Sequence, residues 1–257
     1  MRLATRIALG AAAPVVVIAG YGIVTSASPD PFFPPIPVIL DRFAQLWLFA
    51  RVGTDAVPSL VNFAAGFALA VAVGVPVGVL FGQIRWLGEM MLPLMDFARS
   101  VPPIMLIPPL VLVLGVGDTS KIAIIFLGAF FPIVVSTLDG LRRTDPALVD
   151  MARSIQLGPA TTVLRLYVPS AAPAIFGGMQ TGLQFALVLM VSSEMVAAVR
   201  GLGFVTMQAQ ATFNAPSVWA GILLLALLGF LINVLFTLVR NRVLAWHIGL
   251  RATLKSR

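Results

Sequence analysis

The sequence predicts an all-α fold, a polytopic bundle of six hydrophobic helices in a membrane. Of the 257 residues, 59% are hydrophobic and only 11% are charged, whereas about a quarter of the residues of a soluble domain are charged. The mean hydropathy is +1.01, and the apolar residues lie in continuous runs of the length, about 20 residues, that spans a bilayer as helix. A soluble domain of this size cannot bury so much apolar surface. The composition therefore excludes a soluble enzyme and, despite a formal net charge of +7, a nucleic-acid-binding protein.

Six apolar runs are predicted to cross the membrane. They cover residues 7–25, 60–82, 88–116, 122–141, 171–199 and 218–239. Their continuous apolar character favours helices over the alternating strands of a transmembrane barrel. The first run follows Arg2 and Arg6 and precedes Ser26 to Ser28, a pattern that also fits a cleaved signal peptide. The five spans that follow favour an uncleaved first helix.

The basic residues predict the orientation of these spans. If the spans alternate, twelve lysines and arginines fall on the side of the N-terminus and four on the other side, with Arg99 inside the third span. Cytoplasmic loops carry the excess of basic residues, so both termini are expected in the cytoplasm. The chain is interpreted as one transmembrane domain over 1–257. It comprises the first span with an outer proline-rich loop (1–58), a core (59–240) and a basic tail (241–257). Within the outer loop, 38–49 has helical spacing.

Prolines interrupt the third span. Pro102, Pro103, Pro108 and Pro109 are expected to break it twice, because each proline removes an amide donor from the helix. Non-helical backbone at membrane depth survives only inside protein or beside water. The segment is therefore expected to face a pore or the interior of an assembly. By contrast, the glycines of the second span, Gly66, Gly74 and Gly78, are expected to allow close helix packing.

Charged residues within spans are costly and mark functional candidates. Arg99 is a candidate for the wall of an anion path, but it also lies three residues after Asp96 and could simply neutralise it. Glu194 lies near the outer end of the fifth span. Its carboxylate either lines the path or accepts hydrogen bonds from backbone groups or water. There is no cysteine and a single histidine, His247 in the tail. No metal site is therefore expected, and no arrangement for an intramembrane enzyme is found.

The loop 144–173 carries a short amphipathic helix. Asp145 and Pro146 form a strong helix start, and Gly158 with Pro159 ends the helix. An apolar stripe recurs with helical spacing at Leu148, Met151, Ala152 and Ile155. A second helical stretch, 160–167, leads into the fifth span. The stripe can pack on the chain's own spans or in the groove of a partner.

This loop resembles the EAA loop of permease subunits of ABC importers. The family pattern is Glu-Ala-Ala, three residues, Gly, nine residues, Ile, one residue, Leu-Pro. Asp150 stands for the Glu, Leu166 falls at the Ile, and Val168 with Pro169 stands for Leu-Pro. The family's Gly falls on Gln156, and the nearest glycine is Gly158. Either Gly158 takes over the turn, or the first helix is longer here.

The resemblance extends over about 59–239 and points to the nitrate, sulfonate and taurine branch of these permeases. The residues that carry it are Pro102-Pro103, Ile107-Pro108, Gly115-Val116-Gly117, Ser120-Lys121-Ile122, Phe131-Pro132-Ile133, Glu194-Met195 and Gly201-Leu202-Gly203. It implies one half of a homodimeric pore in a bacterial inner membrane. It also implies two cytoplasmic ATPase subunits and an extracytoplasmic binding protein that delivers a small, anionic solute.

The resemblance also assigns roles to residues. Those expected to couple to the ATPase subunit are Asp150, Met151, Ala152, Arg153, Ile155 and Gly158. The candidates for the translocation path come instead from the charges and prolines within the spans, and they are Arg99, Pro102, Pro103, Pro108 and Glu194. The chain's two lysines, Lys121 and Lys255, are preceded by Ser120 and Leu254, so no Gly-Lys-Ser/Thr phosphate-binding motif exists. ATP and Mg²⁺ are therefore expected on the partner subunit, and this chain is expected to be neither an enzyme nor the holder of a cofactor.

Two alternatives stay open at the level of the sequence. The solute of such a permease could also be an aromatic carboxylate or a thiamine-precursor pyrimidine. A stand-alone secondary transporter would explain the spans and the charges inside them. It would not explain a capped amphipathic helix held in the cytoplasm.

Overall fold

The computed structural model describes residues 3–27 and 30–246, which form helices joined by short turns. The long helices are α1 Leu3–Ala27, α3 Val57–Gln83, α6 Asp118–Arg142, α9 Val168–Ala197 and α11 Ala215–Val243. The shorter ones are α2 Ile36–Ala44, α4 Arg85–Ser100, α5 Ile107–Leu114, α7 Pro146–Ser154, α8 Pro159–Thr162 and α10 Leu202–Ala211. Tighter or wider helical turns lie at Gln45–Ala50, Val52–Ala56, Pro103–Leu106 and Val163–Tyr167. The predicted all-α class is confirmed.

Within the described residues, four helices are long and apolar enough to cross a membrane. They are Val52–Gln83, Asp118–Arg142, Pro159–Ala197 and Ala215–Val243, and a bent pair, Arg85–Ser100 with Pro103–Leu114, makes a fifth if it counts as one span. These five match the second to sixth predicted spans. The first predicted span is helical in α1, but its described apolar stretch, Val15–Ser26, is shorter than a span. The count of six therefore stays a prediction.

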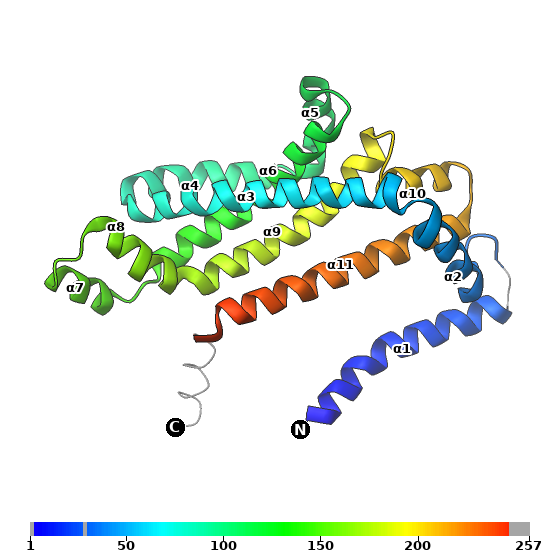
Figure 1. Ribbon diagram of the computed structural model, residues 1–257, viewed down its shortest axis with the longest axis horizontal. Helices are drawn as coiled ribbons and strands as arrows, with labels where there is room; N and C mark the ends of the chain where they lie inside the picture. Colours follow the sequence, from blue (N-terminus) through cyan, green and yellow to red (C-terminus); the bar gives the residue numbers. More distant parts are fainter. Residues whose placement is uncertain (1–2, 28–29, 247–257) are drawn as a thin grey trace.

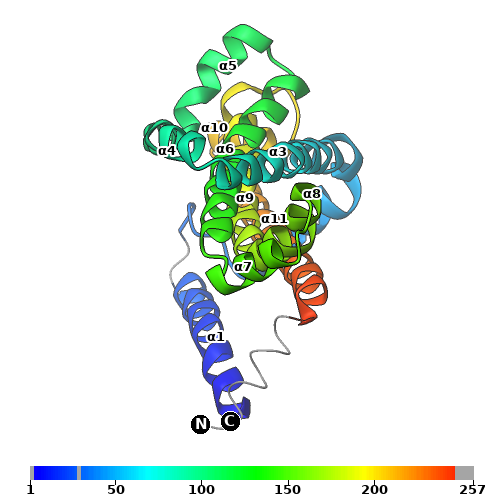
Figure 2. The same cartoon turned by 90° about the vertical axis from the view of Figure 1, so that its left-hand side faces the viewer.

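The core of the bundle is α6, packed between α3 and α9 (Figure 2). The glycines of α3 make this packing possible, as the sequence predicted. A Cβ atom on Gly66 would lie 2.7 Å from the side chain of Ile125, and one on Gly78 would lie 2.6 Å from Thr137. On the other face of α6, a Cβ atom on Gly178 of α9 would lie 2.5 Å from Ser136. Small residues thus bring the three helix backbones close together.

The short elements gather at two opposite ends of the bundle (Figure 1). The loop with α7 and α8 lies at one end, where α6 ends and α9 begins; we call this the α7 end. The helices α2, α5 and α10 lie at the other, the α10 end, where α3 and α11 begin. The long helices thus run in alternating directions between the two ends, as was assumed when the lysines and arginines on the two sides were counted.

The third span contains one sharp break where the sequence predicted two. The axes of Arg85–Ser100 and Pro103–Leu114 meet at 83°, and Val101 and Pro102 between them have extended backbone. Pro108 and Pro109 lie in the first turn of α5 and begin that helix. A proline there costs nothing, because the first amides of a helix have no partner within it. The prediction of a second break was therefore wrong.

The outer loop forms α2 and the turns that follow it, which confirms the helical spacing at 38–49. The Nε atom of Arg42 donates to the hydroxyl of Ser217 at 2.8 Å, and the indole of Trp219 donates to the carbonyl oxygen of Phe32 at 2.9 Å. Both contacts fasten the loop to the start of α11. At the other end of the chain, α11 extends to Val243, into the predicted tail, whose residues 247–257 with His247 lie outside the described residues.

Candidate functional site

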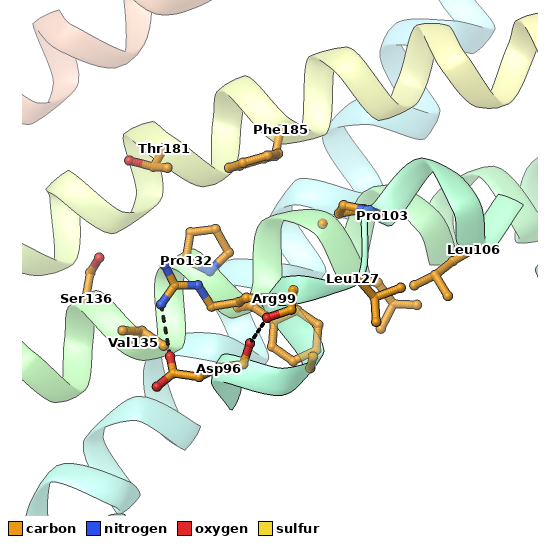
Figure 3. Close-up of a pocket in the computed structure, with 15 residues that line it drawn as sticks. Asp96, Arg99, Pro103, Leu106, Leu127, Pro132, Val135, Ser136, Thr181 and Phe185 are labelled. Carbon is orange, nitrogen blue, oxygen red and sulfur yellow. Dashed lines mark hydrogen bonds and ion pairs between the residues drawn. The ribbon is translucent and has the colours of Figure 1, made fainter. Parts of the chain in front are cut away.

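A cavity of about 670 Å³ lies between α4, α6 and α9 (Figure 3). Most of its wall is apolar, with Leu106, Leu127, Phe131, Val135 and Phe185 among the lining residues. Its charged groups are Asp96 and Arg99 from the last turns of α4, and hydroxyl groups come from Ser100, Ser136 and Thr181. We call it the Arg99 cavity. An apolar hollow with a few convergent polar groups is the usual form of a small-ligand site.

Arg99 and Asp96 form an ion pair across this wall, with 3.5 Å between Nη1 and Oδ1. Both side chains remain partly exposed. A guanidinium has five N–H donors, and this ion pair engages Nη1, so donors remain free to bind a carboxylate, sulfonate or nitrate oxygen. Of the other predicted path residues, Pro103 lines the cavity, whereas Pro102, Pro108 and Glu194 are not part of its wall.

Glu194 lies instead in a buried polar cluster at the α10 end, where it is 1% exposed. Its carboxylate accepts hydrogen bonds from the hydroxyl of Ser59 at 2.6 Å and from the amide of Gly203 at 3.0 Å. The ammonium of Lys121 is 3.8 Å from Oε1. Asp55 completes the cluster by accepting from the amide of Gly201 at 2.9 Å. We call these residues the α10 clamp, because they hold the turn that begins α10.

The turn in this clamp requires glycine. Gly201 has φ +125°, which L side chains rarely adopt, and a Cβ atom there would overlap the carboxylate of Glu194. The charge within a span pointed to Glu194, but no sequence pattern pointed to its contacts with Asp55, Ser59 and Lys121. Ser59 is 135 positions from Glu194, and Asp55 is 146 from Gly201. The glycine pair after Glu194 was the only local signal of this contact.

The loop at the α7 end contains the predicted capped helix. The carboxylate of Asp145 accepts from the amide of Ala147 at 2.9 Å, and Asp150 pairs with Arg153 at 3.5 Å on the surface. The predicted stripe, however, is divided. Ala152 is buried at 3%, whereas Met151 is 54% and Ile155 62% exposed.

The division of the stripe follows from how α7 lies on the chain. The helix packs against the turn Val163–Tyr167, and steps of 100° per residue place Ala152 on the inner side with Val149, which is half-buried. Leu148, Met151 and Ile155 remain outside as an apolar face. Of the four stripe residues, Ala152 therefore packs on the chain itself, while the other three stay exposed.

The turn that ends α7 is formed by Gln156. This residue has φ +52°, its amide donates to the carbonyl oxygen of Arg153 at 2.9 Å, and the amide of Leu157 donates to that of Ala152 at 3.0 Å. These two bonds define a Schellman motif, in which the left-handed position is usually glycine. Gly158 has φ −61° and begins α8. Gln156 thus makes the turn where the family has glycine, and both alternatives drawn from the sequence were wrong.

Comparisons with known proteins agree with this architecture. Residues 74–245 match the family model described as binding-protein-dependent transport system inner membrane component. The chain belongs to this family. It is therefore a multi-pass membrane component of an ABC transporter.

Two related proteins and one solved structure are similar to this permease. A probable ABC transporter permease protein of Brucella abortus is 33% identical over 214 residues, which cover 83% of this chain and 86% of that protein. The taurine transport system permease protein TauC of Escherichia coli is 29% identical over 221 residues, 84% of this chain and 80% of that one. A chain of the inward-facing MetNI methionine ABC transporter has the same fold, with TM-score 0.63, 22% identity, and coverage of 74% and 94%.

The Gln156 turn gives a first prediction about the permease. Replacing Gln156 with glycine should stabilise the α7 loop by about 1 kcal/mol, because a side chain in the left-handed region carries a steric cost that glycine lacks. Amides at the end of α7 should then exchange with solvent about fivefold more slowly. Hydrogen exchange measured by mass spectrometry on the purified permease reports this directly.

Gly158 provides the matched control. Its backbone is extended and a Cβ atom there would meet nothing within 4 Å, so Gly158→Ala should leave exchange in α7 unchanged. Slower exchange in Gly158→Ala, together with unchanged exchange in Gln156→Gly, would contradict the assignment of the turn to Gln156.

Proposed function

We propose that this permease is one half of a homodimeric pore in an ATP-driven importer of a small, anionic solute of the nitrate, sulfonate or taurine type. The observation that carries the proposal is the apolar face of Leu148, Met151 and Ile155, which the α7 loop holds away from the bundle. Exposed apolar side chains on an aqueous loop favour a partner groove. The chain has no Gly-Lys-Ser/Thr motif of its own, so the partner is an ATPase subunit that binds ATP and Mg²⁺.

The solute path in this proposal passes through the Arg99 cavity. Arg99 supplies the positive group there, at the edge of a mostly apolar wall. Taurine, the solute named for the relative in Escherichia coli, carries a sulfonate that a guanidinium binds through paired hydrogen bonds. The carboxylate of Asp96 prevents the site from holding an anion too firmly to release it.

A second copy of the chain completes the pore. α5 projects from the bundle in both views (Figures 1 and 2), and its residues Leu112 and Val113 are more than 80% exposed. We place the α7 end in the cytoplasm, following the basic residues, and the α10 end toward an extracytoplasmic binding protein. Asp150, Arg153 and Gly158 then border the contact with the ATPase subunit, while buried Ala152 supports the helix from within.

Arg99 provides the experiment. Arg99→Gln should lower uptake at least tenfold, since a charge-assisted hydrogen bond to the solute contributes about 1.5–3 kcal/mol. Basal ATP hydrolysis should be unchanged, because the residue is remote from α7. Uptake of a labelled solute into proteoliposomes that contain the whole transporter measures the effect.

The double variant Asp96→Asn with Arg99→Gln separates the two readings of this pair. If Arg99 only neutralises Asp96, the double variant should transport normally. If Arg99 contacts the solute, the double variant should remain impaired. Normal uptake in the double variant would remove Arg99 from the path.

A further inference from the structure

A second, smaller cavity lies beyond the Arg99 cavity, toward the α7 end. It has a volume of about 370 Å³ and lies between the last turns of α6 and the first turns of α9. Ser136 of α6 and Thr181 of α9 line both cavities, and Figure 3 shows them at the end of the Arg99 cavity away from Leu106. The two cavities therefore adjoin each other at Ser136 and Thr181, and together they extend from Arg99 to Arg143.

The charged groups of this second cavity are Asp139 and Arg143. They are four residues apart at the end of α6, yet neither belongs to an ion pair within 4.0 Å among the residues that the structure describes. Asp96 and Arg99, in contrast, are paired. Both Asp139 and Arg143 are exposed, so their charged atoms are available to a ligand in this cavity.

Small residues shape this second cavity. The floor is closed where α6 and α9 meet, because a Cβ atom on Gly140 would lie 2.7 Å from that of Ala174. The wall is open at Gly177, where a Cβ atom would meet nothing within 4 Å. The cavity is thus an open recess beside Arg143, closed at its floor by the contact of α6 with α9.

We propose that Ser136, Asp139, Arg143 and Thr181 form a second binding subsite for a small oxoanion, between the Arg99 cavity and the α7 loop. The inference rests on the proposed function, because it places this subsite on the same solute path. Arg143 attracts the anion and the two hydroxyl groups donate hydrogen bonds to it. Asp139 weakens the binding by repulsion, which suits an exit position, since a transported ion must bind well enough to enter and weakly enough to leave.

The absence of cysteine from the chain allows a direct test by thiol labelling. Single variants Ser136→Cys and Gly177→Cys, in the complete transporter in proteoliposomes, are treated with a sulfonate-bearing and an ammonium-bearing methanethiosulfonate reagent. Both thiols should react. At each of them, the ratio of the reaction rate with the anionic reagent to that with the cationic reagent should be higher than for a free thiol in solution. Thr137→Cys, next to Ser136 but fully buried against α3, should not react.

Arg143 and Arg142 form a matched pair for the charge. Arg143→Gln should lower the ratio of anionic to cationic labelling about tenfold, because one unit charge several ångströms away in a water-like medium changes the two rates about threefold each, in opposite directions. It should also lower uptake. Arg142→Gln should change neither, because its guanidinium lies against Gly88 of α4. Asp139→Asn should raise the labelling ratio.

Three results would overturn the subsite: no labelling at either cysteine, equal effects of the two arginine variants, or normal uptake in Arg143→Gln. Labelling needs no transport, so the labelling results are distinct from a failure of the proposed function. If Arg99→Gln abolishes uptake while Arg143→Gln changes nothing, the path through the Arg99 cavity stands and the second subsite does not exist.

Discussion

Glu194→Ala should destabilise the permease by about 3–5 kcal/mol, the usual cost of removing one partner from a buried charged pair. The change leaves the amide of Gly203 without its acceptor. The ammonium of Lys121, whose side chain is 5% exposed, loses one of its two neighbouring carboxylates and retains that of Asp118 at 3.7 Å. The thermal unfolding midpoint of the purified protein in lipid nanodiscs should fall by about 10 °C.

Two further variants locate this effect in the α10 clamp. Gly201→Ala should destabilise in the same way, because its Cβ atom would overlap the carboxylate of Glu194 and its φ of +125° is unfavourable for alanine. Glu89→Ala removes an acid that pairs with Arg85 on the surface, and it should leave the midpoint unchanged. If Glu194→Ala unfolds at the temperature of Glu89→Ala, the clamp contributes nothing to stability.

The second large effect is expected at Met151. Met151→Glu should weaken binding of the ATPase subunit at least thirtyfold, since an anchor at the centre of a contact contributes about 2 kcal/mol or more. Met151 is exposed and lies between Leu148 and Ile155 on the apolar face of α7, so a charge there should block docking without disturbing the fold. Co-purification of the ATPase subunit and uptake in whole cells should both be lost.

Ala147→Glu is the matched control on the same helix. It introduces the same charge at an exposed position in the first turn of α7, where an acid suits the helix dipole. It should preserve co-purification and uptake. Ala152 is unsuitable for this test because it is buried, so a glutamate there would disrupt the loop itself. Full uptake by Met151→Glu would show that the apolar face does not dock the ATPase subunit.

The parts of the site that depend on neighbouring residues were predictable. Asp145 and Pro146 determine where α7 begins, because capping involves only the next few amides. The pairing of Arg99 with Asp96 follows from their separation of three residues on one helix. Likewise, the glycines of α3 predicted a close contact, although the sequence did not show that α6 is the partner.

The sequence could not predict which side of a helix another element covers. Leu148, Met151, Ala152 and Ile155 share one periodic pattern, yet only Ala152 turns toward the Val163–Tyr167 turn. Pro102 and Pro108 look alike as helix breakers. One lies in the extended link and the other begins α5, and only the course of the backbone distinguishes them.

The helical membrane class, the positions of the main helices and the family that the loop resembles could all be predicted from the amino-acid sequence. Hydrophobic length, helix caps and spaced motifs are properties of short segments, so they can be read without the fold. Only the packed helices show that Glu194 accepts a hydrogen bond from Ser59, 135 positions away, and does not line the Arg99 cavity. They also show that the cavities of Arg99 and Arg143 share Ser136 and Thr181 in their walls. Both results depend on how α3, α6 and α9 pack, because contacts between distant segments exist only after the helices have packed together.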